Sequence, residues 1–219
     1  MRIALDAMGS DAAPVPDVQG AVQAARRFGH EIILVGRDEV IQAELAKHDT
    51  RGLKISIQHA SLVIEMAEHP SQAVKDKPDS SVVVGMRLVR DGQADALVSM
   101  GNSGGMLAAA LIGAGRLGRI PGVRRPAISS VVPNLQGYAF MLDIGANADC
   151  QPAWLAQFAI MGSAYARQVL GVQNPRVGLL ANGEEETKGS ELVQAAHQLI
   201  KGLGLNFVGA ALTNYLIFG

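Results

Sequence analysis

Short apolar runs alternate along the chain with longer segments in which apolar residues recur every three or four positions. The short runs predict strands at 2–6, 31–35, 53–58, 95–99, 127–132, 138–143, 176–180 and from 206 onward. The longer segments predict helices at 14–28, 38–47, 80–90, 104–114, 152–170 and 190–202. Pro70 is expected to break an irregular stretch over 59–68, and Ser80 to cap the helix that follows. This alternation predicts an α/β fold with a largely parallel sheet.

Composition narrows the class of protein. Of the 219 residues, 48% are hydrophobic and 18% are charged, so the chain can bury a sizeable core. The net charge of −1 and the absence of a basic run argue against a nucleic-acid partner. Cys150 is the single cysteine, which excludes an internal disulfide and fits a reducing compartment. No run approaches the roughly 20 apolar residues of a membrane span, so a soluble, cytoplasmic protein is expected.

Four loops that follow predicted strands hold the candidate chemistry. Such loops lie at the carboxyl ends of parallel strands, where ligands bind. The first runs from Asp6 to Pro14, and its acids are either site residues or caps. The second, Ser99-Met-Gly-Asn-Ser-Gly-Gly105, can present backbone N–H groups and a helix N-terminus to an anion; the alternative is a plain tight turn. Without the Lys-Ser/Thr ending of a P-loop, it does not imply ATP.

The other two loops carry charge. The segment 182–188 reads Asn-Gly-Glu-Glu-Glu-Thr-Lys, in which Lys188 could neutralise a phosphate or a developing oxyanion. A solvated charged turn is the alternative for this loop. The loop from Asp143 to Cys150 carries two acids and Asn147. Cys150 is either a nucleophile or a small structural residue, and the lack of a nearby histidine favours the latter.

Two further patterns are set aside. The glycines of 113–118 match GxGxxG by letter, but they follow a helix instead of a strand, so they predict a helix end and turn. The five histidines show no metal-ligand spacing, and no metal or other cofactor is expected.

The four loops, taken in order, resemble a known family. The matching segments are MRIALDAMGSDAAP, HASLVIEM, SMGNSGGMLAAAL, LDIGANADCQP and NPRVGLLANGEEETKGSEL. They are similar to the phosphate acyltransferases of bacterial phospholipid synthesis, the PlsX family. The resemblance runs from Met1 to about Gly209.

This resemblance implies transfer of a long-chain acyl group from the acyl carrier protein (ACP) thioester to inorganic phosphate. The acyl phosphate product would feed a membrane glycerol-3-phosphate acyltransferase. It also implies a Rossmann-like three-layer α/β/α sandwich, similar to the isocitrate dehydrogenase-like and phosphotransacetylase-like folds. Members of the family are typically homodimers that associate peripherally with the membrane.

Site roles follow as hypotheses from the resemblance and the chemistry. Phosphate is already a nucleophile, so the site needs donors for phosphate and oxyanion instead of an enzyme nucleophile. The expected phosphate-binding residues are Gly101, Asn102, Ser103, Gly104 and Gly105. Lys188 is expected to stabilise negative charge, and Asn147 to position substrate or donate to the oxyanion. Asp6 and the glutamates from Glu184 to Glu186 are expected to orient Lys188 or other loop groups.

An arginine cluster is a candidate for docking the acidic carrier protein. Its members are Arg116, Arg119, Arg124 and Arg125. Charge steering would bring an acidic partner to such a cluster. A solvated loop or a dimer contact is the alternative reading.

Three departures from the family pattern leave other functions open. Ser10 and Ala12 stand where the family usually has Gly and His, and Ser103 and Gly105 vary the usual Gly-Asn-Thr-Gly-Ala loop. The family's C-terminal third is missing from a predicted single α/β domain, and the apolar end 210–219 is atypical. The alternatives are a non-catalytic copy that keeps dimerisation or carrier binding, transfer from coenzyme A, and, by fold analogy alone, a nicotinamide oxidoreductase.

Overall fold

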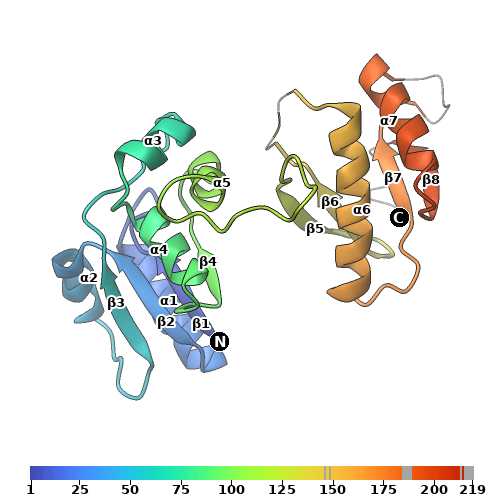
Figure 1. Cartoon of the computed structure of the whole chain (residues 1–219). Helices are drawn as coiled ribbons and strands as arrows, with labels where there is room; N and C mark the ends of the chain where they lie inside the picture. Colours follow the sequence, from blue (N-terminus) through green and yellow to red (C-terminus); the bar gives the residue numbers. More distant parts are fainter. Residues whose placement is uncertain (146, 148, 184–188, 213, 215–219) are drawn as a thin grey trace. The chain divides into compact units, whose positions relative to one another are not determined.

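The computed structural model describes residues 1–145, 147, 149–183, 189–212 and 214 (Figure 1). The chain forms two compact units, Met1–Arg119 and Ile120–Gly219, and each unit has its own hydrophobic core. No helix within the described ranges is both long and apolar enough to cross a lipid bilayer. The expectation of a single α/β domain stays a prediction.

A four-stranded parallel sheet forms the centre of the first unit. Its strands are β1 (Arg2–Asp6), β2 (Glu31–Gly36), β3 (Ile55–His59) and β4 (Ala96–Val98). They lie in the order β3-β2-β1-β4, with Ala4 of β1 opposite Ile33 of β2 and Leu97 of β4 (Figure 1). The chain therefore adds β2 and β3 on one side of β1 and then β4 on the other side.

Helices cover both faces of this sheet. They are α1 (Val15–Phe28), α2 (Asp38–Leu45) and α4 (Ser81–Arg90). In β2, Ile32 and Leu34 pack in the cluster that includes α1 and α2, whereas Ile33 and Val35 pack in the cluster that includes α4. A strand buried on both faces needs apolar residues at every position, which explains the uninterrupted run over 32–35.

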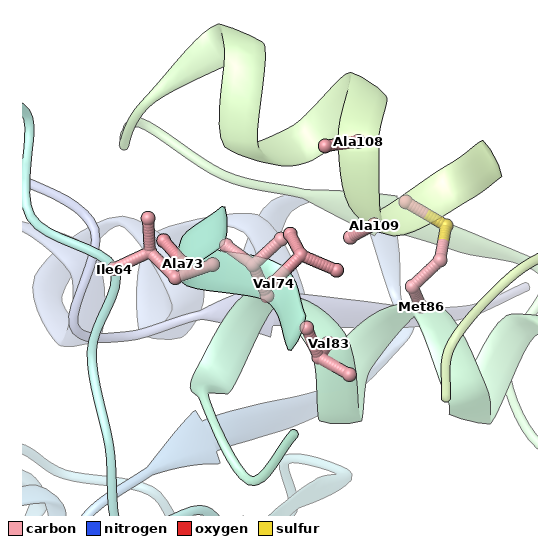
Figure 2. Close-up of a cluster of buried hydrophobic side chains, with 8 residues drawn as sticks. Ile64, Ala73, Val74, Val83, Met86, Ala108 and Ala109 are labelled. Carbon is pink, nitrogen blue, oxygen red and sulfur yellow. The ribbon is translucent and has the colours of Figure 1, made fainter. Parts of the chain in front are cut away.

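Two more helices, α3 (Pro70–Asp76) and α5 (Ser103–Leu111), complete the first unit. Figure 2 shows Ala108 and Ala109 of α5 facing Val74 of α3 and Val83 of α4, with Met86 beside them. The alanines have short side chains, so the helices can approach closely while the interior stays filled.

Of two local expectations about helix starts, the one for Pro70 was wrong, and the one for Ser80 is confirmed for its position only. Pro70 was expected to break the chain, but it opens α3, because its fixed φ and missing N–H suit the first turn of a helix. Ser80 does occupy the N-cap position of α4, but its side chain makes no capping hydrogen bond there. Its hydroxyl is instead buried and has no hydrogen-bond partner among the described residues.

Among the residues of the second unit that the structure describes, there are two pairs of strands and two helices. Strands β5 (Ser129–Asn134) and β6 (Gly137–Leu142) form an antiparallel hairpin. Strands β7 (Val177–Leu180) and β8 (Phe207–Ala211) pair in parallel. The helices are α6 (Pro152–Gln168) and α7 (Glu191–Lys201). Side chains of α6, β7 and α7 form the core of this unit, with Ala196 and Ile200 of α7 at its centre. The predicted α/β class with mostly parallel pairing is confirmed.

Candidate functional site

The strand order of the first unit creates a switch point between β1 and β4. The helix after β1 packs on one face of the sheet, whereas the helix after β4 packs with α3 and α4 on the other face, an arrangement typical of ligand sites in parallel sheets. The β1–α1 loop begins after Asp6, and the β4–α5 loop runs from Ser99 to Asn102. Both predicted loops therefore lie side by side at this edge of the sheet (Figure 1).

Asp6 joins the two loops. Its carboxylate is 1% exposed, and both oxygens accept hydrogen bonds. Oδ1 accepts the Met8 N–H at 3.1 Å, and Oδ2 accepts the Ser99 hydroxyl at 2.7 Å. The Ser99 Oγ in turn accepts the Gly101 N–H at 3.1 Å. The linking role of Ser99 was not predicted, although a serine directly after a strand and before a glycine loop indicates such a role.

Gly9 lets the backbones of the two loops meet. A Cβ at this position would lie 2.7 Å from Asp6 Oδ2 and 2.9 Å from the Gly101 nitrogen. Both contacts are shorter than a carbon atom tolerates. The glycine is therefore required for the close approach of the β1–α1 loop to the β4–α5 loop.

Asn102 caps α5 and also holds a neighbouring loop. Its Oδ1 accepts the Gly105 N–H at 2.9 Å, which satisfies one of the free donors of the first turn. Its Nδ2 donates to the carbonyls of Glu65 at 3.1 Å and Met66 at 3.2 Å. Its side chain is therefore engaged on both sides.

The N–H groups of Ser103 and Gly104 remain for a ligand. Neither donates a hydrogen bond to any residue that the structure describes. Both belong to the first turn of α5, where the helix dipole and free N–H groups favour an anion. The exposed Ser103 hydroxyl adds a third donor at the same place.

Lys77 fixes the loop 61–69 that Asn102 contacts. Its Nζ donates to the Val63 carbonyl at 2.7 Å and to Glu68 Oε2 at 2.6 Å. The ammonium lowers the pKa of Glu68, with a further contribution from the Glu65 N–H. The loop beside the start of α5 is thus held from two directions.

Ser10, one of the departures from the family pattern, contacts a buried acid. Its hydroxyl donates to Asp17 Oδ2 at 2.5 Å, and Asp17 is 6% exposed. Burial raises the pKa of Asp17; the Ser10 hydrogen bond opposes this shift, and the charge of Asp6 adds to it. Ala12 has no polar side chain to contribute to this cluster.

In the second unit, Asp143 organises the predicted loop. It follows β6 with a φ of 63°, and it accepts hydrogen bonds from Asn147 Nδ2 at 2.8 Å and from the Cys150 thiol at 3.0 Å. Asn147 Nδ2 also donates to the Pro126 carbonyl at 3.3 Å. Burial, followed by the hydrogen bond to Asp143, raises the pKa of Cys150 to about 11. A thiol with this pKa is a poor nucleophile at neutral pH.

The remaining predicted residues fall in three places. Lys188 and the glutamates 184–186 lie outside the described residues, between β7 and α7. Arg116 and Arg119 belong to the first unit, whereas Arg124 and Arg125 belong to the second; all four are exposed. Arg125 lies over the ring of Trp154, with 5.0 Å from its guanidinium carbon to the ring centroid.

The family follows from comparison along the whole chain. A model described as "Fatty acid synthesis protein" matches residues 1–219. The chain belongs to this family. The resemblance inferred from the loop motifs is thereby confirmed, because curated relatives of this chain are named phosphate acyltransferase.

Two such relatives illustrate the extent of the match. The phosphate acyltransferase of Pelotomaculum thermopropionicum is 53% identical over 209 residues, which cover 95% of this chain and 60% of the relative. The phosphate acyltransferase of Herpetosiphon aurantiacus is 51% identical over 210 residues, which cover 95% of this chain and 56% of the relative. The chain thus spans about three fifths of the length of these relatives.

Solved structures with a similar fold are phosphotransacetylases. The one from Streptococcus pyogenes aligns with a TM-score of 0.68 at 18% identity, covering 97% of this chain and 68% of the other. The one from Staphylococcus aureus aligns with a TM-score of 0.64 at 20% identity and the same coverage. At this level of identity the likeness establishes the fold, and it confirms the phosphotransacetylase-like α/β architecture predicted from the resemblance.

Proposed function

We propose that this chain transfers a long-chain acyl group from the thioester of acyl carrier protein to inorganic phosphate. The observation that carries the proposal is 53% identity over 209 residues to a phosphate acyltransferase. The arrangement of β1 and β4 supports it, because two loops of the matching motifs adjoin at the switch point of the sheet.

Phosphate is proposed to bind at the start of α5. The N–H groups of Ser103 and Gly104 and the Ser103 hydroxyl supply the donors. Gly101, Asn102 and Gly105 shape this loop, because their N–H or side-chain groups are engaged in the hydrogen bonds that hold it. Residues 101–105 thus form the proposed phosphate loop, in which two residues donate to the phosphate and three hold the shape of the loop.

The reaction needs two substrates held together and stabilisation of the charge that develops. A phosphate oxygen attacks the thioester carbonyl carbon, the C–S bond breaks, and the hydrogenphosphate proton ends on the released thiol. Positioning the two reactants supplies much of the rate enhancement, so no nucleophile from the enzyme is required. The raised pKa of Cys150 agrees with this scheme.

Three further residues are assigned roles in the same reaction. Lys188 is proposed to neutralise the phosphate and the oxyanion, with Glu184 orienting its ammonium group. Asn147 is proposed to position substrate through the loop it braces. Its amide nitrogen already donates to Asp143 and to Pro126, which favours positioning over donation to an oxyanion.

The acyl chain and its carrier need different surfaces. Met66 and Met100 are 62% and 69% exposed and belong to the two loops joined by Asn102, so they offer apolar area beside the phosphate loop. The exposed arginines at 116, 119, 124 and 125 are proposed to receive the acidic carrier protein.

Assembly and downstream partners complete the proposal. We propose a homodimer that associates peripherally with the membrane, where a glycerol-3-phosphate acyltransferase consumes the acyl phosphate. An acyl phosphate hydrolyses readily, so delivery to a neighbouring enzyme would limit its loss.

Trapping with hydroxylamine tests the reaction. The folded 219-residue chain is incubated with palmitoyl carrier protein, with and without phosphate, and hydroxamate and free thiol are measured. We expect phosphate-dependent formation of both products. A folded sample that releases neither would overturn catalysis by this chain and favour a non-catalytic copy. Faster turnover of palmitoyl-coenzyme A than of the carrier thioester would overturn the proposed donor.

Charge variants test the residue roles. Lys188→Ala is expected to lower kcat/KM about 100-fold or more, as removal of a donor to an oxyanion does. The control Lys54→Ala removes an exposed lysine just before β3, at the opposite end of the sheet, and should have no effect. Full turnover in Lys188→Ala would remove this residue from the mechanism.

Arg124→Glu with Arg125→Glu should raise KM for the carrier substrate only, whereas Arg27→Glu should not.

A further inference from the structure

We propose that Ser99 is a positioning residue that sets the shape of the phosphate loop by linking the Gly101 N–H to the Asp6 carboxylate. The inference rests on the proposed function, since it treats the 101–105 loop as the phosphate site. Neither Ser99 nor Asp6 is proposed to touch substrate.

The sheet register brings the two side chains together. Leu5 of β1 lies opposite Val98 of β4, so Asp6 and Ser99 are the next residues along two parallel neighbours. Their side chains meet at the carboxyl edge, with 2.7 Å between Ser99 Oγ and Asp6 Oδ2. This contact joins residues 93 positions apart in sequence.

The carboxylate fixes the direction of the hydroxyl. The Ser99 hydroxyl donates to Asp6 Oδ2, so the Ser99 proton points to Asp6. The lone pairs of Ser99 Oγ then receive the Gly101 N–H at 3.1 Å. Without this acid, the Ser99 hydroxyl could rotate, and the hydrogen bond from the Gly101 N–H would be lost.

This link decides which N–H groups face a ligand. The Gly101 N–H is directed to Ser99 and the Gly105 N–H to the Asn102 side chain. The N–H groups of Ser103 and Gly104 lie between these two fixed points. Both carboxylate oxygens of Asp6 accept hydrogen bonds, one from the Met8 N–H and one from the Ser99 hydroxyl. An acidic side chain beside Ser99 disfavours an anion there, which leaves the start of α5 as the place for phosphate.

Amide exchange of Gly101 provides a test that does not depend on catalysis. In Ser99→Ala we expect the Gly101 N–H to exchange about 10-fold faster, the effect of losing one hydrogen bond. Ser99→Thr keeps the hydroxyl and should restore the protection. Ser56→Ala, an exposed serine of β3 in the same sheet, is the matched control and should leave Gly101 unchanged. Unchanged Gly101 exchange in Ser99→Ala overturns the inference.

Steady-state kinetics separate positioning from general loss of stability. Ser99→Ala should raise KM for phosphate about 10-fold and leave KM for the acyl donor unchanged, with recovery in Ser99→Thr. An equal loss for both substrates, or an unchanged KM for phosphate, contradicts the positioning role. If the unaltered chain lacks activity, the proposed function fails, and Gly101 exchange still decides whether Ser99 sets the loop.

Discussion

Buried carboxyl groups at the edge of the first sheet have different partners and therefore different energetic roles. Asp6 accepts two hydrogen bonds from the loops it joins. Asp17 is buried beside Asp6, and the Ser10 hydroxyl is a neutral donor that only partly offsets the cost of burying a charge. Because the pKa of Asp17 is raised, the ionised form of this residue works against folding.

Asp17→Asn should therefore stabilise the protein at pH 7. The folded state binds the Asp17 proton more tightly than the unfolded chain, so the free energy of unfolding falls as pH rises above 3.8. Asparagine keeps an oxygen for Ser10 and removes the charge. We expect a higher unfolding temperature than wild type at pH 7 and a smaller difference near pH 4.

Asp95→Asn is the control with the opposite sign. The backbone N–H and the guanidinium of Arg2 lower the pKa of Asp95, so its contribution is present at neutral pH and is lost in acid. This variant should destabilise at pH 7, with an effect that shrinks below pH 3.8. Destabilisation of Asp17→Asn at pH 7 would show that its carboxylate has a structural role.

Cys150 should react slowly with iodoacetamide. With a pKa of about 11, roughly 1% of the thiol is ionised at pH 9. The alkylation rate is expected to rise tenfold per pH unit up to about pH 10, and unfolded chain should react far faster at pH 9. Asp143→Asn removes the negative charge that accepts the thiol hydrogen bond, so it should lower the pKa of Cys150 and speed alkylation. A rate that levels off near pH 8 would contradict this environment.

At the scale of elements, α4 shows how one glycine sets a packing distance. Gly85 faces β4, and a Cβ there would lie 2.6 Å from Leu97 Cδ1. Leu97 packs against two core clusters, so it has little room to move aside. The helix gives up some intrinsic stability at this position in exchange for close contact with the sheet.

A pair of glycine-to-alanine variants isolates this contact. Gly20→Ala in α1 meets no atom within 4 Å, so it should stabilise by about 0.5–1 kcal/mol through helix propensity. Gly85→Ala gains the same propensity but overpacks Leu97, which costs roughly 1–3 kcal/mol. Chemical denaturation should place Gly85→Ala about 1–3 kcal/mol below Gly20→Ala. Equal stabilities would show that Leu97 yields freely.

The molecule as a whole has two units that meet in sequence within a stretch lacking helix or strand, 112–128. The stretch includes the four arginines proposed to dock the carrier, all of them exposed. The first unit holds a complete three-layer arrangement with its own cores. It should therefore keep its fold when this stretch is cut.

Limited trypsin digestion tests this division. We expect the first cuts at Arg116, Arg119, Arg124 or Arg125, followed by a persistent N-terminal fragment of about 120 residues. Mass spectrometry locates the cuts, and circular dichroism shows whether the fragment melts cooperatively. Glutamine at all four positions should remove the early cuts. Early cleavage within α1 or α4 would contradict an independently stable first unit.

The sequence by itself determined the α/β class, the family, and nearly all the helices and strands of the described residues. Local periodicity specifies elements, and the glycine and polar residues after strands specify loops. The prediction for Pro70 was wrong because proline can either end a helix or occupy its first turn. Which of the two occurs depends on the surrounding contacts.

Only the tertiary structure decided which polar groups of the loops have partners. Strand order brought Asp6 to Ser99 across 93 positions and directed the Gly101 N–H inward. The same folding occupied the Asn102 amide with Glu65 and Met66, and left Ser103 and Gly104 open. Hydrogen-bond partners so distant in sequence depend on register and burial, which no local pattern encodes.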